Sequence, residues 1–184
     1  MKTPFLIGDR ICLRPLERED ARVLEFYIND PDVTRTLQAY RPMNLQIEED
    51  WIADLYKKES DIVLGIAIKS SDKLIGATGL HRLEFKDRRA EFGISIGAKE
   101  EWDKGYGTEA TRLIVGYGFE TLNLNRISLR VYEHNPRAQR AYEKAGFKKE
   151  GVLRKEVYRL GRYWDTIVMG ILREEWDALA ASKK

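Results

Sequence analysis

The sequence has little cysteine and histidine, with one Cys and two His among 184 residues. A single cysteine, Cys12, excludes a disulfide within the chain, and its place in an apolar strand pattern favours a core residue over a reactive thiol. With so few soft ligands no metal-binding cluster is visible, so no metal is expected. The sequence also shows neither a long hydrophobic run nor a signal peptide, which makes a cytoplasmic location away from membranes the default expectation.

An excess of charge of one sign is missing too. The 32 basic and 30 acidic side chains leave a net charge of +2. That balance gives no support to nucleic-acid binding, and no predicted helix carries a basic stripe free of acids. Repeats, low-complexity tracts and linkers are absent from the sequence. The length and the 43% hydrophobic content therefore predict a folded protein with a single domain over residues 1–184.

The most informative stretch covers residues 91–110. Phe92, Ile94 and Ile96 alternate with smaller residues, which predicts a strand, and apolar residues from Ala110 onward recur at helical spacing. Between the strand and the helix lies the segment Trp-Asp-Lys-Gly-Tyr-Gly-Thr, residues 102–108. We expect the helix to begin after this segment.

A glycine-bearing turn that opens a helix is suited to hold a phosphate. The first N–H groups of a helix have no partner within the helix, the helix dipole adds positive charge, and Gly105 and Gly107 allow a ligand to approach the backbone. Alone this signal is weak, because many such turns bind nothing. It also lacks the third glycine of a dinucleotide fingerprint, and Lys104 precedes the glycines instead of following them as in a P-loop.

A second motif indicates what kind of ligand this turn binds. Residues 135–147 read Asn-Pro-Arg-Ala-Gln-Arg-Ala-Tyr-Glu-Lys-Ala-Gly-Phe. Together the two segments resemble the GNAT superfamily, whose members move an acetyl group from acetyl-CoA to an amine. The Asn, Ala, Tyr, Lys and Gly-Phe positions of its second signature all match. Trp102 departs from the Gln or Arg that usually opens the first signature, but it resembles the branch of RimJ/RimL-type ribosomal-protein N-terminal acetyltransferases.

The residue patterns and this resemblance predict the same fold class. Both indicate an α/β fold with a GNAT-like mixed, mostly antiparallel central sheet flanked by helices. The expected elements are strands over 10–15, 61–69, 74–83, 91–96 and 126–132, helices over 17–28, from 45, after 108 and over 136–145, and a hairpin turning at 160–162. The resemblance implies that the strands at 91–96 and 126–132 splay apart. The pantetheine arm of CoA would enter that gap and pair with the backbone groups of Ile94 and Ile96.

The resemblance also implies the site residues. Tyr142 would donate a proton to the leaving thiolate, and packing is its alternative role. Glu91 would act as base, with a water chain as the alternative base. The alternative role for Glu91 is a strand-end salt bridge with Arg88, Arg89 or another basic residue. CoA would be held by Ile94, Ser95, Ile96, Trp102, Asp103, Lys104, Gly105, Tyr106, Gly107, Thr108, Asn135, Ala138 and Lys144. The N-terminal helices would cover the acceptor end, with Tyr27, Asp30, Arg35 and Tyr40 as candidate acceptor contacts. His81 is expected to be a hydrogen-bonded core or edge residue and not a catalytic base.

The acceptor amine is the open question at this stage. The branch resemblance favours a protein N-terminal α-amine, and polyamines, amino acids and aminoglycosides are alternatives. A non-catalytic acyl-CoA-binding module is an alternative of another class, against which the presence of Glu91 and Tyr142 argues. A homodimer is a further option, because the C-terminal hairpin offers a strand edge to a second copy.

Overall fold

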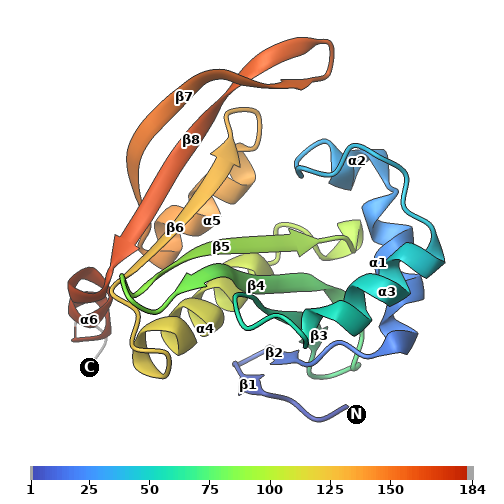
Figure 1. Cartoon of the computed structure of the whole chain (residues 1–184), viewed down its shortest axis with the longest axis horizontal. Helices are drawn as coiled ribbons and strands as arrows, with labels where there is room; N and C mark the ends of the chain where they lie inside the picture. The colour runs from blue at the N-terminus through green and yellow to red at the C-terminus, as the bar shows by residue number, and fades with distance from the viewer. Residues whose placement is uncertain (1, 182–184) are drawn as a thin grey trace.

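The computed structural model describes residues 2–181 (Figure 1). Its strands form an eight-stranded sheet in the order β1-β2-β3-β4-β5-β6-β8-β7. Neighbouring strands in the described chain pair antiparallel, except for β5 and β6, which pair in parallel. The strands are β1 (Leu6–Ile7), β2 (Ile11–Arg14), β3 (Ile62–Ile68), β4 (Leu74–Glu84), β5 (Arg89–Ile96), β6 (Arg126–Tyr132), β7 (Lys148–Arg159) and β8 (Arg162–Leu172). The expected α/β fold with a mixed, mostly antiparallel sheet is confirmed.

Helices cover both faces of this sheet. They are α1 (Ala21–Ile28), α2 (Pro31–Thr34), α3 (Leu45–Leu55), α4 (Tyr106–Glu120), α5 (Pro136–Ala145) and α6 (Arg173–Ala181). Val63 packs with α1 and α3, whereas its neighbour Leu64 belongs to the core that includes α4. Because successive strand residues point to opposite faces, α1 and α3 lie on one face of the sheet and α4 on the other. None of the helices within residues 2–181 combines the length and the apolar character needed to cross a bilayer.

The central feature of the fold is the narrow junction between β5 and β6. They pair only where Arg89, Ala90 and Glu91 face residues 126–128. Beyond Glu91 the two strands diverge, as Figure 1 shows, so the expected splay is confirmed. The N–H of Gly97, just after β5, donates to the carbonyl of Ile75 on β4. Backbone groups alternate in direction along a strand, so Ile94 and Ile96 direct theirs into the gap.

Three local features differ from the sequence-based expectation. Helix α4 begins at Tyr106 and not after Thr108, because Gly105 takes a left-handed φ of 85° as its N-cap. The strand β1 and the helix α2 were not predicted, since two and four residues are too few to show a period.

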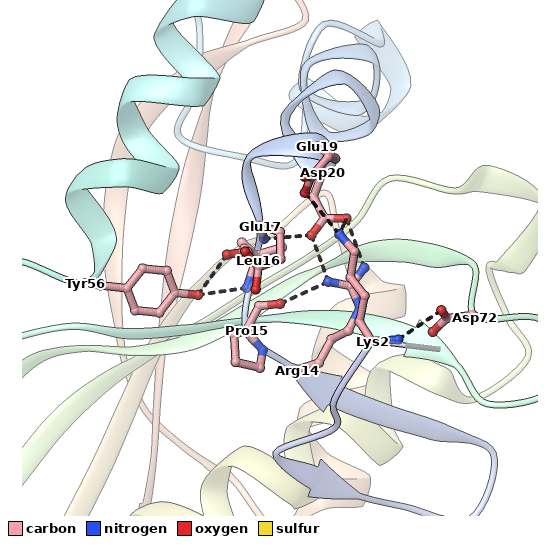
Figure 2. Close-up of polar contacts among 9 residues, drawn as sticks. All are labelled: Lys2, Arg14, Pro15, Leu16, Glu17, Glu19, Asp20, Tyr56 and Asp72. Carbon is pink, nitrogen blue, oxygen red and sulfur yellow. Dashed lines mark hydrogen bonds and ion pairs between the residues drawn. The ribbon is translucent and has the colours of Figure 1, made fainter.

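A buried ion pair fixes the start of α1 against β2 (Figure 2). The guanidinium of Arg14 donates to both carboxylate oxygens of Asp20, at 2.8 and 2.9 Å. Asp20 also accepts the backbone N–H of Glu17 and the ammonium of Lys2. This cluster sets where α1 leaves the sheet, and α1 forms one wall of the cleft described next.

Candidate active site

A cleft of about 1200 Å³ runs along the gap between β5 and β6. One end meets the first turn of α4, and the other end lies under α1 and α3. All but one of the thirteen residues assigned to CoA line it; the exception is Lys104, whose ammonium pairs with Glu101 at 2.9 Å. The cleft therefore brings the two sequence motifs together.

The α4 end of the cleft presents backbone donors. The first intrahelical bond runs from the N–H of Glu109 to the carbonyl of Gly105, so the N–H groups of Tyr106, Gly107 and Thr108 precede it. A Cβ added at Gly107 would meet only the tip of Ile96, at an ordinary 3.4 Å. The space over this turn is therefore open to a ligand, and free amides at a helix start fit the pyrophosphate of CoA.

Arg10 holds this turn in place and was missed at the sequence level. Its guanidinium donates to the Lys104 carbonyl (2.7 Å) and to the carboxylate of Glu109 (3.1 Å). Glu109 in turn accepts the backbone N–H groups of Arg10 and Ile11. Arg10 and Glu109 lie far apart in the sequence, so no local pattern could link them. The contacts tie the phosphate turn to β2.

Trp102 has a different contact from the one expected. Its indole Nε1 donates to the carbonyl of Ile96 at 2.7 Å. This carbonyl therefore already has a hydrogen-bond partner, which corrects the expectation that it pairs with the pantetheine arm of CoA. The guanidinium of Arg137 lies 3.6 Å from the centre of the Trp102 ring. Burial lowers the pKa of Arg137, the nearby Asp103 opposes that effect, and Arg35 adds to it. The stack extends the cleft wall from β5 to α5.

Tyr142 reaches the middle of the cleft from α5. Asn135 begins this helix, because its side-chain oxygen accepts the N–H of Ala138 at 3.2 Å. The Tyr142 ring packs edge-on against Phe92, with centroids 5.7 Å apart, and against Phe147. Burial raises the pKa of Tyr142, so the hydroxyl stays protonated at neutral pH. A protonated hydroxyl lining the cleft is suited to donate a proton.

The opposite end of the cleft forms a chamber, here called the acceptor chamber. It is enclosed by α1, α3 and the facing side of β3, β4 and β5. Its polar and aromatic lining consists of Tyr27, Tyr40, Glu48, Trp51, Asp61, His81, Arg82 and Glu91.

The structure separates the four candidate acceptor contacts. Tyr27 lines the chamber and donates its hydroxyl proton to the Leu74 carbonyl, and Tyr40 lines it while 73% exposed. Asp30 instead caps α2 and pairs with Lys99 at 2.7 Å. Arg35 pairs with Asp32 at 3.2 Å. Neither Asp30 nor Arg35 is among the cleft-lining residues, so both are withdrawn as acceptor contacts.

Carboxylates dominate the charge of the acceptor chamber. Glu91 pairs with Arg82 at 3.0 Å, so the salt bridge weighed from the sequence is present, with a basic residue other than Arg88 or Arg89. Asp61 lies 3.3 Å from His81. Glu48 is only 5% exposed, and its carboxylate has no hydrogen bond or ion pair within the described residues. Burial, and secondarily the charge of Glu25, raise the pKa of Glu48. Glu48 was missed because it belongs to an acidic run that reads as a solvated helix face.

No three His, Cys, Asp or Glu side chains within residues 2–181 could together hold a metal ion. The cleft itself offers acids, bases and backbone amides. The N–H donors lie at one end of the cleft, the Tyr142 hydroxyl lies between, and the carboxylates lie at the other end. This order suits a long anionic donor at one end and a cationic acceptor at the other.

Comparisons with known proteins agree with this geometry. Residues 10–148 match the family model described as acetyltransferase (GNAT) domain. The chain is 36% identical to the uncharacterized N-acetyltransferase YoaA of Bacillus subtilis, over 92% of this chain and 97% of that protein. It is 33% identical to the spermidine N(1)-acetyltransferase of Escherichia coli K12, over 90% and 88%.

A solved structure shows the same fold. The spermidine N-acetyltransferase of Vibrio cholerae, in complex with CoA and spermine, superposes with a TM-score of 0.85 at 29% identity, covering 92% of this chain and 99% of that one. The putative ribosomal N-acetyltransferase YdaF of B. subtilis is 31% identical over 93% of this chain and 96% of its own. The fold, the family model and these relatives agree, and the chain belongs to the GNAT family of N-acetyltransferases.

Proposed function

We propose that this enzyme transfers the acetyl group of acetyl-CoA to a primary amine of a small polycation of the polyamine class. The observation that carries the proposal is the acceptor chamber, where Glu48 is buried without a partner. A buried carboxylate is costly unless a cation pairs with it, and a polyamine supplies a second ammonium beyond the one that reacts. The likeness to spermidine acetyltransferases supports the same acceptor class.

The cleft suggests how its residues act. The N–H groups at the start of α4 hold the pyrophosphate, and the gap beside Ile94 takes the pantetheine arm. The amine attacks the thioester carbonyl, whose oxygen gains negative charge beside a backbone N–H of β5. The C–S bond then breaks, and Tyr142 donates its proton to the sulfur. These roles extend the expectations for the CoA-binding set and for Tyr142.

A protein N-terminal α-amine is the second candidate. It was the main expectation from Trp102 and its neighbours, and the likeness to YdaF supports it. An α-amine brings one charge to the chamber, whereas a polyamine brings several, so the carboxylates favour the polyamine. Membership of an acetyltransferase family removes the non-catalytic acyl-CoA-binding module.

The acceptor class can be measured with a panel. Purified protein is incubated with acetyl-CoA and either spermidine, spermine, an N-terminal peptide, an amino acid or an aminoglycoside, and thiol release is followed. We expect the highest kcat/KM for the polyamines. A peptide that exceeds both polyamines would assign the ribosomal-type activity and overturn the proposal.

Replacing Gly107 with valine should weaken acetyl-CoA binding by about tenfold or more, because losing contacts to the turn amides costs about 1–2 kcal/mol. The protein itself has room for a Cβ at this position, so the variant should fold. Calorimetric titration with acetyl-CoA measures the effect. Lys104→Ala is the matched control, since the Lys104 side chain pairs with Glu101 and is not among the residues that line the cleft, and it should change affinity much less. Equal affinities for Gly107→Val and wild type would place the pyrophosphate elsewhere.

Replacing Glu48 with glutamine should raise KM for spermidine by about 10-fold or more, since a charge-assisted hydrogen bond is worth about 1.5–3 kcal/mol. Acetyl-CoA affinity should not change. Glu49→Gln is the control, because the Glu49 carboxylate pairs with Arg18 at 2.7 Å. An unchanged KM for Glu48→Gln would remove this carboxylate from the acceptor site.

The same variant should stabilise the ligand-free protein. The pKa of Glu48 is raised on folding, so its ionised form at neutral pH opposes folding, and that cost disappears as the pH falls through the raised pKa. Glutamine removes the charge at every pH, and a gain of about 1 kcal/mol corresponds to roughly 2–4 °C in Tm. Calorimetric melting at pH 7.5 tests this, and a lower Tm would show that Glu48 supports the fold.

A further inference from the structure

We propose that His81, oriented by Asp61, takes the proton from the acceptor amine. The inference rests on the proposed amine acetylation and assigns the base that the reaction needs. It replaces the sequence-based expectations that His81 is structural and that Glu91 is the base.

The position of His81 places its ring inside the acceptor chamber. On β4, His81 is the direct register partner of Glu91 on β5. Leu80, its neighbour, is fully buried in the core that contains α4. The alternation of side chains therefore turns His81 to the other face, where the chamber lies, and its side chain is 40% exposed. A bound amine can reach it.

Asp61 sets the orientation of the imidazole. Its Oδ1 lies 3.3 Å from Nδ1 of His81, and the same oxygen accepts the backbone N–H of Arg82 at 3.1 Å. The carboxylate is thus fixed from β4 itself. A carboxylate beside Nδ1 favours a proton on that nitrogen, which leaves the lone pair of Nε2 free to accept another.

The free nitrogen faces the strand on which the thioester is expected. A Cβ added at Gly93 would lie 3.1 Å from Nε2 of His81, so the absent side chain at Gly93 makes room for the ring. Gly93 directly precedes Ile94, whose backbone groups face the gap. Nε2 therefore lies beside the place where an amine must stand to attack a carbonyl bound at Ile94.

Glu91 is a weaker candidate because it already has a partner. Arg82 donates to its carboxylate at 3.0 Å. If the Glu91 carboxylate accepted a proton, it would lose the negative charge that pairs with Arg82. An imidazole is the side chain best matched to proton transfer near neutral pH.

The proton balance is complete with groups in the cleft. The ammonium R–NH3⁺ gives one proton to Nε2 of His81, and the neutral amine uses its lone pair to form the C–N bond. The tetrahedral adduct breaks its C–S bond, and the leaving sulfur takes the proton of Tyr142. The nitrogen's second proton returns to Tyr142, and the imidazolium releases its proton to solvent. The products are the amide, CoA–SH and one H⁺.

The test compares His81→Gln, Asp61→Asn and Glu91→Gln between pH 6 and 10. The panel amine with the highest wild-type turnover is used, so the test does not depend on the polyamine assignment. We expect His81→Gln to lower kcat/KM by about 100-fold or more near pH 7. The loss should shrink toward pH 10, where more of the amine is already neutral. Asp61→Asn should show a smaller loss, Glu91→Gln the smallest, and acetyl-CoA affinity should stay unchanged in all three.

The pH dependence of kcat/KM also reflects the other charged groups of the acceptor chamber. These are Asp61, which directly precedes β3, Arg82 on β4, Glu91 on β5 and Glu48 on α3. His81→Ala provides the decisive readout. Added imidazole should restore its activity by tenfold or more, which a structural role would not allow. Wild-type kcat/KM in His81→Gln, or a Glu91→Gln loss larger than that of His81→Gln, would overturn the inference. Preference for a non-polyamine acceptor would overturn only the proposed function.

Discussion

Replacing Tyr142 with phenylalanine should lower kcat by about 10²–10⁴-fold, the usual contribution of general acid catalysis. The change removes one hydroxyl and keeps the ring, so the edge-on packing against Phe92 and Phe147 is retained. Because burial raises the pKa of Tyr142, the wild-type hydroxyl stays protonated through the neutral range. The loss should therefore be nearly constant from pH 6 to 9, and steady-state thiol release measures it.

Two controls separate catalysis from packing. Acetyl-CoA affinity by calorimetry and the Tm should remain close to wild type in Tyr142→Phe. Tyr117→Phe, on α4 and packed on Phe5, removes a hydroxyl outside the cleft lining and should leave kcat unchanged. If Tyr142→Phe turns over like the wild type, Tyr142 only packs, and water is the leading candidate for the acid.

Replacing Asp20 with asparagine should destabilise the protein by about 3–5 kcal/mol, because it leaves the buried Arg14 charge without its counter-ion. Both side chains are under one-tenth exposed, at 3% and 8%. At about 2–4 °C per kcal/mol the Tm should fall by roughly 6–20 °C. Glu19→Gln is the matched control: that carboxylate lies 3.7 Å from Lys2 and is 80% exposed, so its removal should have little effect. A Tm within about 2 °C of wild type would contradict the assigned weight of the buried pair.

The same pair fixes a pH dependence. Burial alone would raise the pKa of Asp20, but hydrogen bonds from Arg14, Glu17 and Lys2 outweigh it and lower the pKa to about 2. A depressed pKa adds stability above the unfolded value of about 4, and that stability is lost as the pH falls through about 2. Denaturant unfolding between pH 5 and 2 should show a steeper loss for the wild type than for Asp20→Asn.

The fold could be predicted largely because local signals were strong. Alternating Phe92, Ile94 and Ile96 predicted β5. The helix expected from residue 45 is α3, which Asn44 caps by accepting the N–H of Ile47. The two motifs predicted residues that line the α4 and α5 side of the cleft, since each motif is contiguous in the sequence. Short elements and the exact start of α4 were not predicted, because they depend on single backbone angles such as that of Gly105.

The acceptor side could not be predicted in the same way. Glu48, Asp61 and His81 come from α3, the start of β3 and the end of β4, and only the packing of those elements brings them to one chamber. Their residue types are ordinary at helix faces and strand ends. Arg10 was not predicted for the same reason, since its contacts with Lys104 and Glu109 join residues 94 and 99 positions apart in the sequence.

The narrow junction between β5 and β6 also divides the sheet into two halves that differ in how they assemble. Strands β1 to β5 lie in sequence order, and β6, β8 and β7 come from the last third of the chain. Only three residue pairs join β5 and β6 within the described chain, so backbone hydrogen bonds between these two strands contribute little to joining the halves. Helix α4 contacts β2, β4 and β5 on one side and α5 on the other, so it connects the two halves across the junction between β5 and β6. The helix whose first turn is proposed to hold the donor therefore also joins the two halves of the sheet. Because these contacts link segments far apart in the sequence, we expect the docking of α4 to be a slow, long-range step in folding.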